Sequence, residues 1–221
     1  MGKTLRRCTS KEKKAYKSRS KGKNSQKSGA EWLPSLWQDT FEKLLLRDKE
    51  LDYGDHWTID FSYIQTNTLS LEERRGGWKV SCHCTNGKFQ CASCQRMWPS
   101  ARVQVLFRYR LWTGQGWGTV IMRPFGQSCH YCRNDVFEFC GFLKRDVKQT
   151  LRRLFAKIRK NCYGEEDGEV SYSLPVCAPK AKAKPHESSL CEACDMGICS
   201  QQDRSRTFWG TAAQNVNKEK I

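Results

Sequence analysis

The chain has 221 residues, thirteen cysteines and a formal net charge of +16, and its mean hydropathy of −0.74 indicates that much of it stays in contact with water. No segment approaches the roughly 20 consecutive apolar residues that a membrane-spanning helix needs, and residues 1–29 lack the apolar stretch of a secretory signal. We therefore expect neither a membrane-spanning nor a secreted protein, and we expect the cysteines to be reduced thiols in the cytoplasm.

Most of the positive charge lies at the N-terminus. Residues 1–29 contain eleven Lys or Arg and the single acid Glu12. Residues 1–30 have almost nothing apolar to bury, so we expect a disordered basic tail. Such a tail is attracted to any polyanion and to anionic lipid surfaces, which predicts at most a peripheral contact with the endoplasmic reticulum or plasma membrane.

The folded part is predicted to open with a helix and a strand. Ser35 and Gln38 fit a capping box at the start of a helix. The apolar residues of this helix recur on one face: Trp37, Phe41, Leu44 and Leu45. Residues 57–64 alternate strictly between apolar and polar side chains, which predicts a half-buried strand.

A longer alternation covers residues 101–111, with apolar side chains at the odd positions and Leu106 as the interruption on the polar side. Gly114, Gly116 and Gly118 predict a turn, and residues 119–127 are predicted to return as the antiparallel partner.

The clearest helical pattern spans residues 147–162, with Asp146 as its expected cap and Gly164 as its expected end. After residue 165 the pattern stops. Residues 178–185 are predicted to be an extended linker, and residues 201–221 a polar, disordered tail.

The predicted fold is α+β: a small antiparallel β-sheet, stapled by zinc and resembling a zinc-ribbon hairpin with CxxC knuckles, flanked by helices. We expect one domain over residues 31–200, with the linker inside it.

Two CxxC pairs carry the main chemical signal: Cys91 with Cys94, and Cys129 with Cys132. Two thiolates separated by two residues can both point into a tight turn, so each pair supplies half of a tetrahedral Zn²⁺ site. The predicted hairpin between the pairs returns its ends to one place. A redox role would need a pair at the start of a helix in a βαβ unit, whereas strands surround these. We predict a structural zinc site at the closed end of a β-hairpin.

A second set of thiols follows the predicted linker. His186, Cys191, Cys194 and Cys199 form a complete Cys₃His ligand set within fourteen residues. Alternatively, Cys191 and Cys194 could reach back to Cys82 and Cys84, which flank His83. We favour the local set.

The sequence gives no sign of catalysis. Sites with four protein ligands leave no position for water, so they stabilise a fold instead of activating a nucleophile. Walker, GxGxxG, HExxH and deaminase-type zinc motifs do not occur in the chain. We expect no enzyme and no small-molecule substrate.

Basic side chains favour a second class of function, the binding of nucleic acid. The candidate residues lie on one strand face and one helix face: Arg102, Arg108, Arg110, Lys148, Arg152 and Lys157. Aromatic residues are interleaved with them, as in modules that stack on bases. The alternative is that these cations are ordinary solvated faces.

Several strings of the sequence resemble the receptor-transporting protein family, whose domain is a 3CxxC-type zinc finger. These strings are Gly-Gly-Trp at 76–78, Lys-Phe-Gln-Cys-Ala-Ser-Cys-Gln-Arg-Met-Trp-Pro-Ser-Ala-Arg-Val-Gln-Val-Leu-Phe at 88–107, Met-Arg-Pro-Phe-Gly-Gln-Ser-Cys at 122–129, Cys-Tyr-Gly at 162–164, and residues 186–199.

The resemblance implies an accessory, chaperone-like factor that helps G-protein-coupled receptors of the odorant or taste type reach the cell surface. Its partners would be those receptors or their export machinery. Because some members of the family are linked to antiviral defence and RNA, an RNA-binding role in innate immunity is the alternative.

Overall fold

The computed structural model describes residues 31–165 and 186–199. The predicted tails, 1–30 and 201–221, and the predicted linker, 178–185, lie outside the described residues.

The described chain forms helices and strands in mixed order, which confirms the α+β class. The longer elements are α2 (Pro34–Leu46), β1 (His56–Phe61), β2 (Lys79–Gln90), β3 (Met97–Trp112), β4 (Trp117–Pro124) and α4 (Lys144–Tyr163). The short ones are α3 (Leu71–Arg75), β5 (Gln127–Ser128), β6 (Phe137–Glu138), the 3₁₀ helix η2 (Ser188–Leu190) and α5 (Glu192–Asp195).

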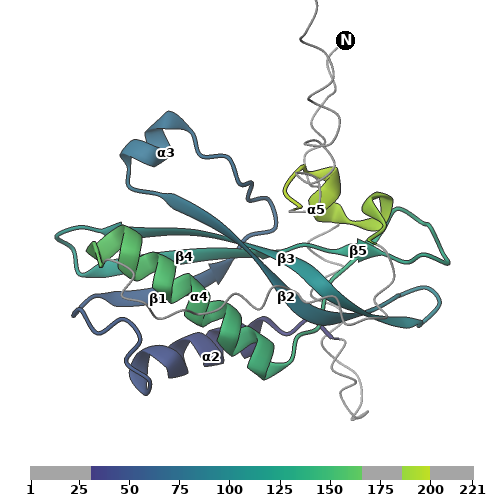
Figure 1. The fold of residues 1–221 in the computed structure, drawn as a ribbon, viewed down its shortest axis with the longest axis horizontal. Coiled ribbons are helices and arrows are strands. Elements are labelled where there is room, and N and C mark those ends of the chain that lie inside the picture. The colour runs from purple at the N-terminus through teal and green to yellow at the C-terminus, as the bar shows by residue number, and fades with distance from the viewer. Residues whose placement is uncertain (1–30, 166–185, 200–221) are drawn as a thin grey trace, which may run out of the picture.

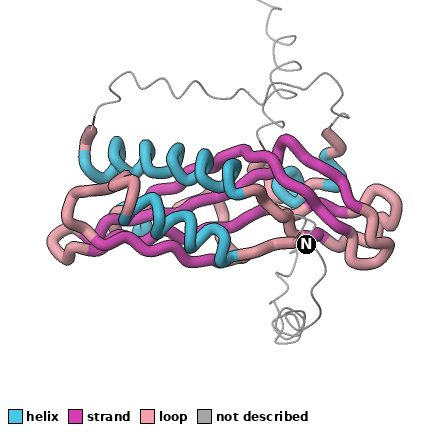
Figure 2. The backbone as a smooth tube through the Cα atoms, turned by 90° about the horizontal axis from the view of Figure 1, so that it is seen from below, coloured by secondary structure: helices cyan, strands magenta, loops and turns pink. Residues whose placement is uncertain are grey.

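The main sheet has the order β1-β4-β3-β2. The pairs β2–β3 and β3–β4 are antiparallel, but β1 runs parallel to β4. The sheet is therefore mixed, whereas the sequence predicted an antiparallel one. The helices α2 and α4 lie side by side against one face of this sheet, as Figures 1 and 2 show. A core forms between them because the predicted apolar faces meet there: Trp37, Phe41 and Leu44 of α2, Val147, Leu151, Leu154, Phe155 and Ile158 of α4, and Val103, Val105, Phe107 and Tyr109 of β3 are all buried.

Leu106 interrupts the alternation of β3 because the opposite face of the sheet has a small core of its own. Leu106 is fully buried there together with Phe125, Ala193 and Ile198. The latter two belong to the segment 186–199, which packs on this face near one end of the sheet (Figure 1). An apolar side chain on the polar side of β3 therefore marks the place where this segment docks.

Both predicted helix starts are wrong in detail. α2 begins at Pro34 with Leu33 as its N-cap and no side-chain cap, because a proline at the first position needs no hydrogen-bond acceptor and has a helical φ. α4 begins at Lys144, so Asp146 lies inside its first turn, where its carboxylate accepts a hydrogen bond from Asn86 Nδ2 at 3.2 Å. The predicted end is confirmed: Gly164 has a φ of 72° and closes α4.

The glycine-rich turn is confirmed at two of its three positions. Gly114 and Gly116 have positive φ values of 81° and 67° between β3 and β4. Gly118 instead lies within β4, opposite Trp57 of β1. A Cβ atom at this position would lie 2.1 Å from the Trp57 ring, so the glycine makes room for the indole.

Candidate metal centres

The first candidate metal centre lies where two loops meet beyond the end of the main sheet. Cys91 and Cys94 lie in the turn that closes the β2–β3 hairpin, and Cys129 and Cys132 lie between β5 and β6. The predicted hairpin, β3–β4, thus has the centre at its open end. The hairpin whose turn contains Cys91 and Cys94 is β2–β3, which the sequence did not predict. The strands next to these loops are also joined, because the Gln127 side chain of β5 accepts a hydrogen bond from Trp98 Nε1 and donates one to Ser100 Oγ of β3, both at 3.0 Å.

The four sulfur atoms fit a tetrahedral zinc ion. All four lie within 4.8 Å of one another. Cys91 Sγ is 3.6 Å from Cys132 Sγ, and Cys94 Sγ is 3.7 Å from Cys129 Sγ. A tetrahedron with Zn–S bonds of about 2.3 Å has sulfur–sulfur edges of about 3.8 Å, whereas a disulfide has an S–S bond of about 2.05 Å.

Each CxxC pair is held by the same backbone turn. Gln95 N–H donates to Cys91 O, and Arg133 N–H donates to Cys129 O, both at 2.9 Å. The donor is in each case the fourth residue after the first cysteine, and it has a positive φ, 60° at Gln95 and 44° at Arg133. Non-glycine residues rarely adopt this conformation, so two copies of it indicate that the loop shape is imposed by a common requirement.

In the first centre, backbone amides favour a thiolate at Cys91, whereas the neighbouring thiols of Cys94 and Cys91 raise the pKa of Cys132. The amide of Cys94 lowers the pKa of Cys91 to about 7, helped by the amide of Ser93 and opposed by burial. Backbone N–H groups that point at a sulfur atom stabilise its thiolate form, including when the thiolate binds a metal ion. Glu138 Oε1 accepts a hydrogen bond from Ala92 N–H at 2.6 Å, which fixes the first knuckle against β6. Nothing in the sequence distinguished Glu138, Gln95 or Arg133 as supporting residues.

The second candidate centre is built from a single short segment. His186, Cys191, Cys194 and Cys199 place one nitrogen and three sulfur atoms within 4.8 Å of one another. His186 Nε2 lies 3.1 Å from Cys194 Sγ and 3.7 Å from Cys199 Sγ. The neighbouring thiol of Cys199, and then burial, raise the pKa of Cys191, because three crowded thiols resist successive ionisation. A divalent cation offsets that repulsion, so this donor set also fits zinc.

The second centre is docked on the sheet by one buried ion pair. Glu192 of α5 accepts from Arg123 Nη2 of β4 at 2.7 Å and from Gly126 N–H at 2.6 Å. Arg123 and Glu192 are only 8% and 18% exposed. The pair therefore fixes the segment on the same face as Leu106 and Phe125.

Contacts also run directly between the two centres. His130, which lies between Cys129 and Cys132, is 2.9 Å from Glu187, the neighbour of His186. Arg133 reaches the same carboxylate at 3.5 Å. The second centre thus rests on both the sheet and the second knuckle of the first centre.

Cys82 and Cys84 do not join either set of sulfur atoms among the described residues. They lie in β2, opposite Leu106 and Gln104 of β3. Of the two arrangements left open by the sequence, the structure assembles the local one. Cys140 is buried in the core, and Cys8 and Cys177 lie outside the described residues.

The candidate nucleic-acid residues on β3 are engaged within the protein. Arg108 pairs with Glu73 of α3 and with Gln65. The guanidinium of Arg110 lies over the ring of Trp112, 3.5 Å from its centroid. Arg102 is half-buried. This strand face is therefore not an open row of cations.

The candidate residues on α4 divide into two groups. Lys148 and Arg152 pair with Asp48, at 2.9 and 3.1 Å, and Arg152 also pairs with Glu50 at 2.9 Å. The hydrogen bond from Lys148 is the main cause that lowers the pKa of Asp48. Only Lys157 of the three is exposed.

The described residues contain no helix with the length and apolarity needed to cross a membrane. No solved structure matches the chain.

Comparison with known proteins identifies the domain. The 3CxxC zinc-ribbon family, described as a zinc-binding domain, matches residues 84–197, just over half of the chain. Receptor-transporting protein 4 of Homo sapiens is 34% identical over 167 residues, which is 75% of this chain and 64% of that protein. Receptor-transporting protein 3 of Mus musculus is 30% identical over 167 residues, 76% of this chain and 34% of that protein. Receptor-transporting protein 2 of Mus musculus is 34% identical over 147 residues, 66% of this chain and 62% of that protein.

The chain thus spans less than two thirds of the length of each of these relatives. The matched region nevertheless includes both knuckles of the first centre and most of the second. The chain belongs to the receptor-transporting protein family, whose zinc-binding domain is of the 3CxxC type.

Proposed function

We propose that the chain is a non-catalytic accessory protein of receptor transport, in which two zinc ions hold a protein-binding surface in shape. One ion is held by Cys91, Cys94, Cys129 and Cys132, and the other by His186, Cys191, Cys194 and Cys199. Each set has four protein ligands, so neither centre offers a position at which water could be activated. The partners are G-protein-coupled receptors of the odorant or taste type, or their export machinery.

The similarity to receptor-transporting proteins over about three quarters of the chain is the observation that carries this proposal. The surface agrees with a binding role, because several large apolar side chains are exposed around the first centre and on the sheet rim: Met97, Trp117, Tyr131, Val136, Phe139 and Leu143. The pairing of Arg108, Lys148 and Arg152 with internal partners removes cations on which the RNA-binding alternative relied.

The test is delivery of an odorant or taste receptor to the cell surface. An epitope-tagged receptor is expressed with and without the chain, and surface label is counted on intact cells. We expect more surface receptor with the wild-type chain and with Cys82→Ser, and no increase with Cys94→Ser, which removes a proposed ligand. No increase with well-expressed wild-type chain, for any receptor of a representative panel, would contradict the proposal.

A further inference from the structure

Among the residues that the structure describes, the outer edge of β2 is partly open. β2 is the last strand of the sheet order, and within this part of the chain only β3 pairs with it along most of its length. Val80 is half-buried and Cys82 is exposed. An accessible strand edge carries backbone donors and acceptors that another strand can use.

Two hydrogen bonds fix which residues of β2 point outward. Phe125 N–H of the loop after β4 donates to Gln104 O, so the even-numbered residues of β3 bond towards β4 and the odd-numbered ones towards β2. On β2 the even-numbered residues then point away from β3. Arg153 Nη2 of α4 confirms this, because it donates to Cys84 O from outside the sheet at 2.8 Å.

The open section is short and has defined ends. Before this section, Trp78 N–H donates a hydrogen bond to Glu73 O. After it, Arg153 donates a hydrogen bond to Cys84 O, and Gly141 pairs with Lys88. Between these points, Val80 and Cys82 each present an N–H and a C=O that have no backbone partner within residues 31–165 and 186–199. These four backbone groups can form hydrogen bonds with an added strand of about four residues.

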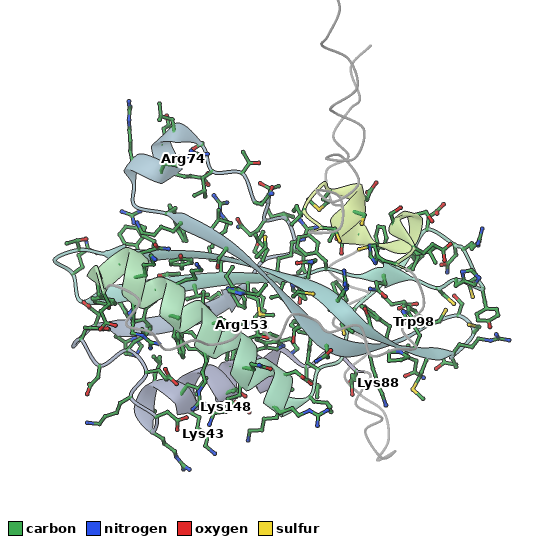
Figure 3. All side chains as sticks on the ribbon, in the orientation of Figure 1. Lys43, Arg74, Lys88, Trp98, Lys148 and Arg153 are labelled. Atoms are coloured by element: carbon green, nitrogen blue, oxygen red, sulfur yellow. The ribbon has the colours of Figure 1, made fainter. Side chains whose placement is uncertain are left out.

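The helix side of this edge is basic. Arg153 and Lys157 project from α4 near His83, and Lys79 begins β2 (Figure 3 labels Arg153 where α4 lies over β2). Burial and then these two α4 cations lower the pKa of His83 to about 4. Neither Lys79 nor Lys157 forms an ion pair within the described part of the chain, whereas Lys148, Arg152 and Arg159 on the α2 side are paired with Asp48 or Glu50.

We propose that the edge at Val80–Cys82 is a docking site for an extended acidic segment of a partner protein, which adds to the sheet as a short fifth strand beside β2. Successive side chains of a strand point to opposite faces, so acidic residues would face Lys79 and Lys157 while the residues between them face Val80 and Cys82. Charge complementarity selects an acidic partner over a basic one. This inference goes beyond receptor transport and does not depend on it.

The direct test is binding of a blocked eight-residue peptide of alternating Glu and Val to the full-length, metal-containing chain, followed by NMR. We expect the amide signals of Val80 and Cys82 to shift and to become protected from hydrogen exchange. A peptide with Lys in place of Glu should bind at least about tenfold more weakly, because it meets the same cations. No binding of the Glu peptide, or equal binding of both peptides, would overturn the proposal.

A proline provides a specific block. Cys82→Pro removes an N–H that points away from β3, and edge strands tolerate proline at such positions. It should weaken peptide binding at least about tenfold, because it removes a hydrogen bond and obstructs the edge, whereas Cys82→Ser keeps the N–H and should bind normally. Unchanged binding in a folded Cys82→Pro variant would contradict the site.

A charge reversal tests the docking site without a proline substitution. Lys157→Glu should weaken binding about two- to tenfold at low salt, and Lys43→Glu, an exposed position on α2, should not. If the amides of Val80 and Cys82 are already protected in the free chain, the chain itself covers the edge, for example with its acidic residues near 165–169, and the proposal of an external partner fails.

Discussion

Cys94 is the exposed member of the first centre, whereas Cys91 and Cys129 are buried. Cys94→Ser changes little volume but replaces a thiolate by a poor ligand. We expect this variant to lose the zinc of the first centre and several kcal/mol of stability, since structural zinc contributes on the order of 10 kcal/mol. Zinc per chain and urea unfolding measure both. Cys82→Ser is the matched control, as an exposed cysteine outside both centres, and equal zinc content in the two variants would refute the ligand assignment.

His83 makes folding depend on pH. Its pKa is lowered to about 4, by burial first and then by Arg153 and Lys157, whereas an unfolded histidine has a pKa of about 6.5. Between these values the unfolded chain binds the extra proton, so this residue reduces stability as pH falls from about 6.5 to about 4. NMR titration of the ring should show the low pKa, and His83→Phe should flatten that part of the stability profile relative to wild type. A ring that titrates near 6.5 would contradict the buried environment.

At the scale of elements, the Arg123–Glu192 pair holds the segment 186–199 on the sheet. Arg123→Met leaves Glu192 without its cation in a largely buried place, which should cost about 3 kcal/mol of unfolding free energy. The double variant Arg123→Met/Glu192→Gln should recover part of that loss, because no charge is then left alone. A double-mutant cycle measures the coupling, and strictly additive single effects would show that the pair does not act as one unit.

The elements predicted best are those whose own side chains repeat with a regular period. Residues 101–111 and 147–162 were recognised because burial on one face imposes alternation on a strand and a three- to four-residue spacing on a helix. β2 is not predicted because the side chains on its core-facing side include the half-buried His83 and the buried Thr85, which resemble a polar strand face or a loop. The helix starts differ from the prediction because neither helix has a side-chain cap: α2 begins at Pro34 after Leu33, and Asp146 lies inside the first turn of α4, where it bonds Asn86.

For the whole molecule, metal removal is the broadest test. Both centres lie at junctions: the first joins the β2–β3 turn to the β5–β6 loop, and the second fixes residues 186–199 to the sheet. A chelator should therefore abolish cooperative folding, seen as loss of near-ultraviolet circular dichroism and a new sensitivity to protease. A zinc-saturated chelator is the control. Retention of the native spectrum after complete metal loss would show that the apolar core suffices.

The charge distribution leads to our proposal for membrane contact. Eleven basic residues at 1–29 can each add up to about 1 kcal/mol of attraction to an anionic leaflet. This attraction is screened at 1 M salt, where the Debye length is about 3 Å. Cell membranes washed at low and high salt should release the chain only at high salt. Retention through the high-salt wash with release by detergent would indicate an anchor or a tightly held membrane partner.

The local chemistry could be predicted from the amino-acid sequence alone: the CxxC pairs, the His186–Cys199 ligand set as one of two arrangements, the amphipathic elements and the basic N-terminus. Such features depend on residues close together in the chain. Only the packing of the elements brings distant groups together. Within residues 31–165 and 186–199 it places Cys82 and Cys84 apart from the second set of ligands, pairs α4 cations with Asp48 and Glu50 about a hundred residues earlier, and leaves Val80 and Cys82 without a neighbouring strand on the outer side of β2. Contacts between residues far apart in sequence depend on how the elements pack, and no local pattern encodes that packing.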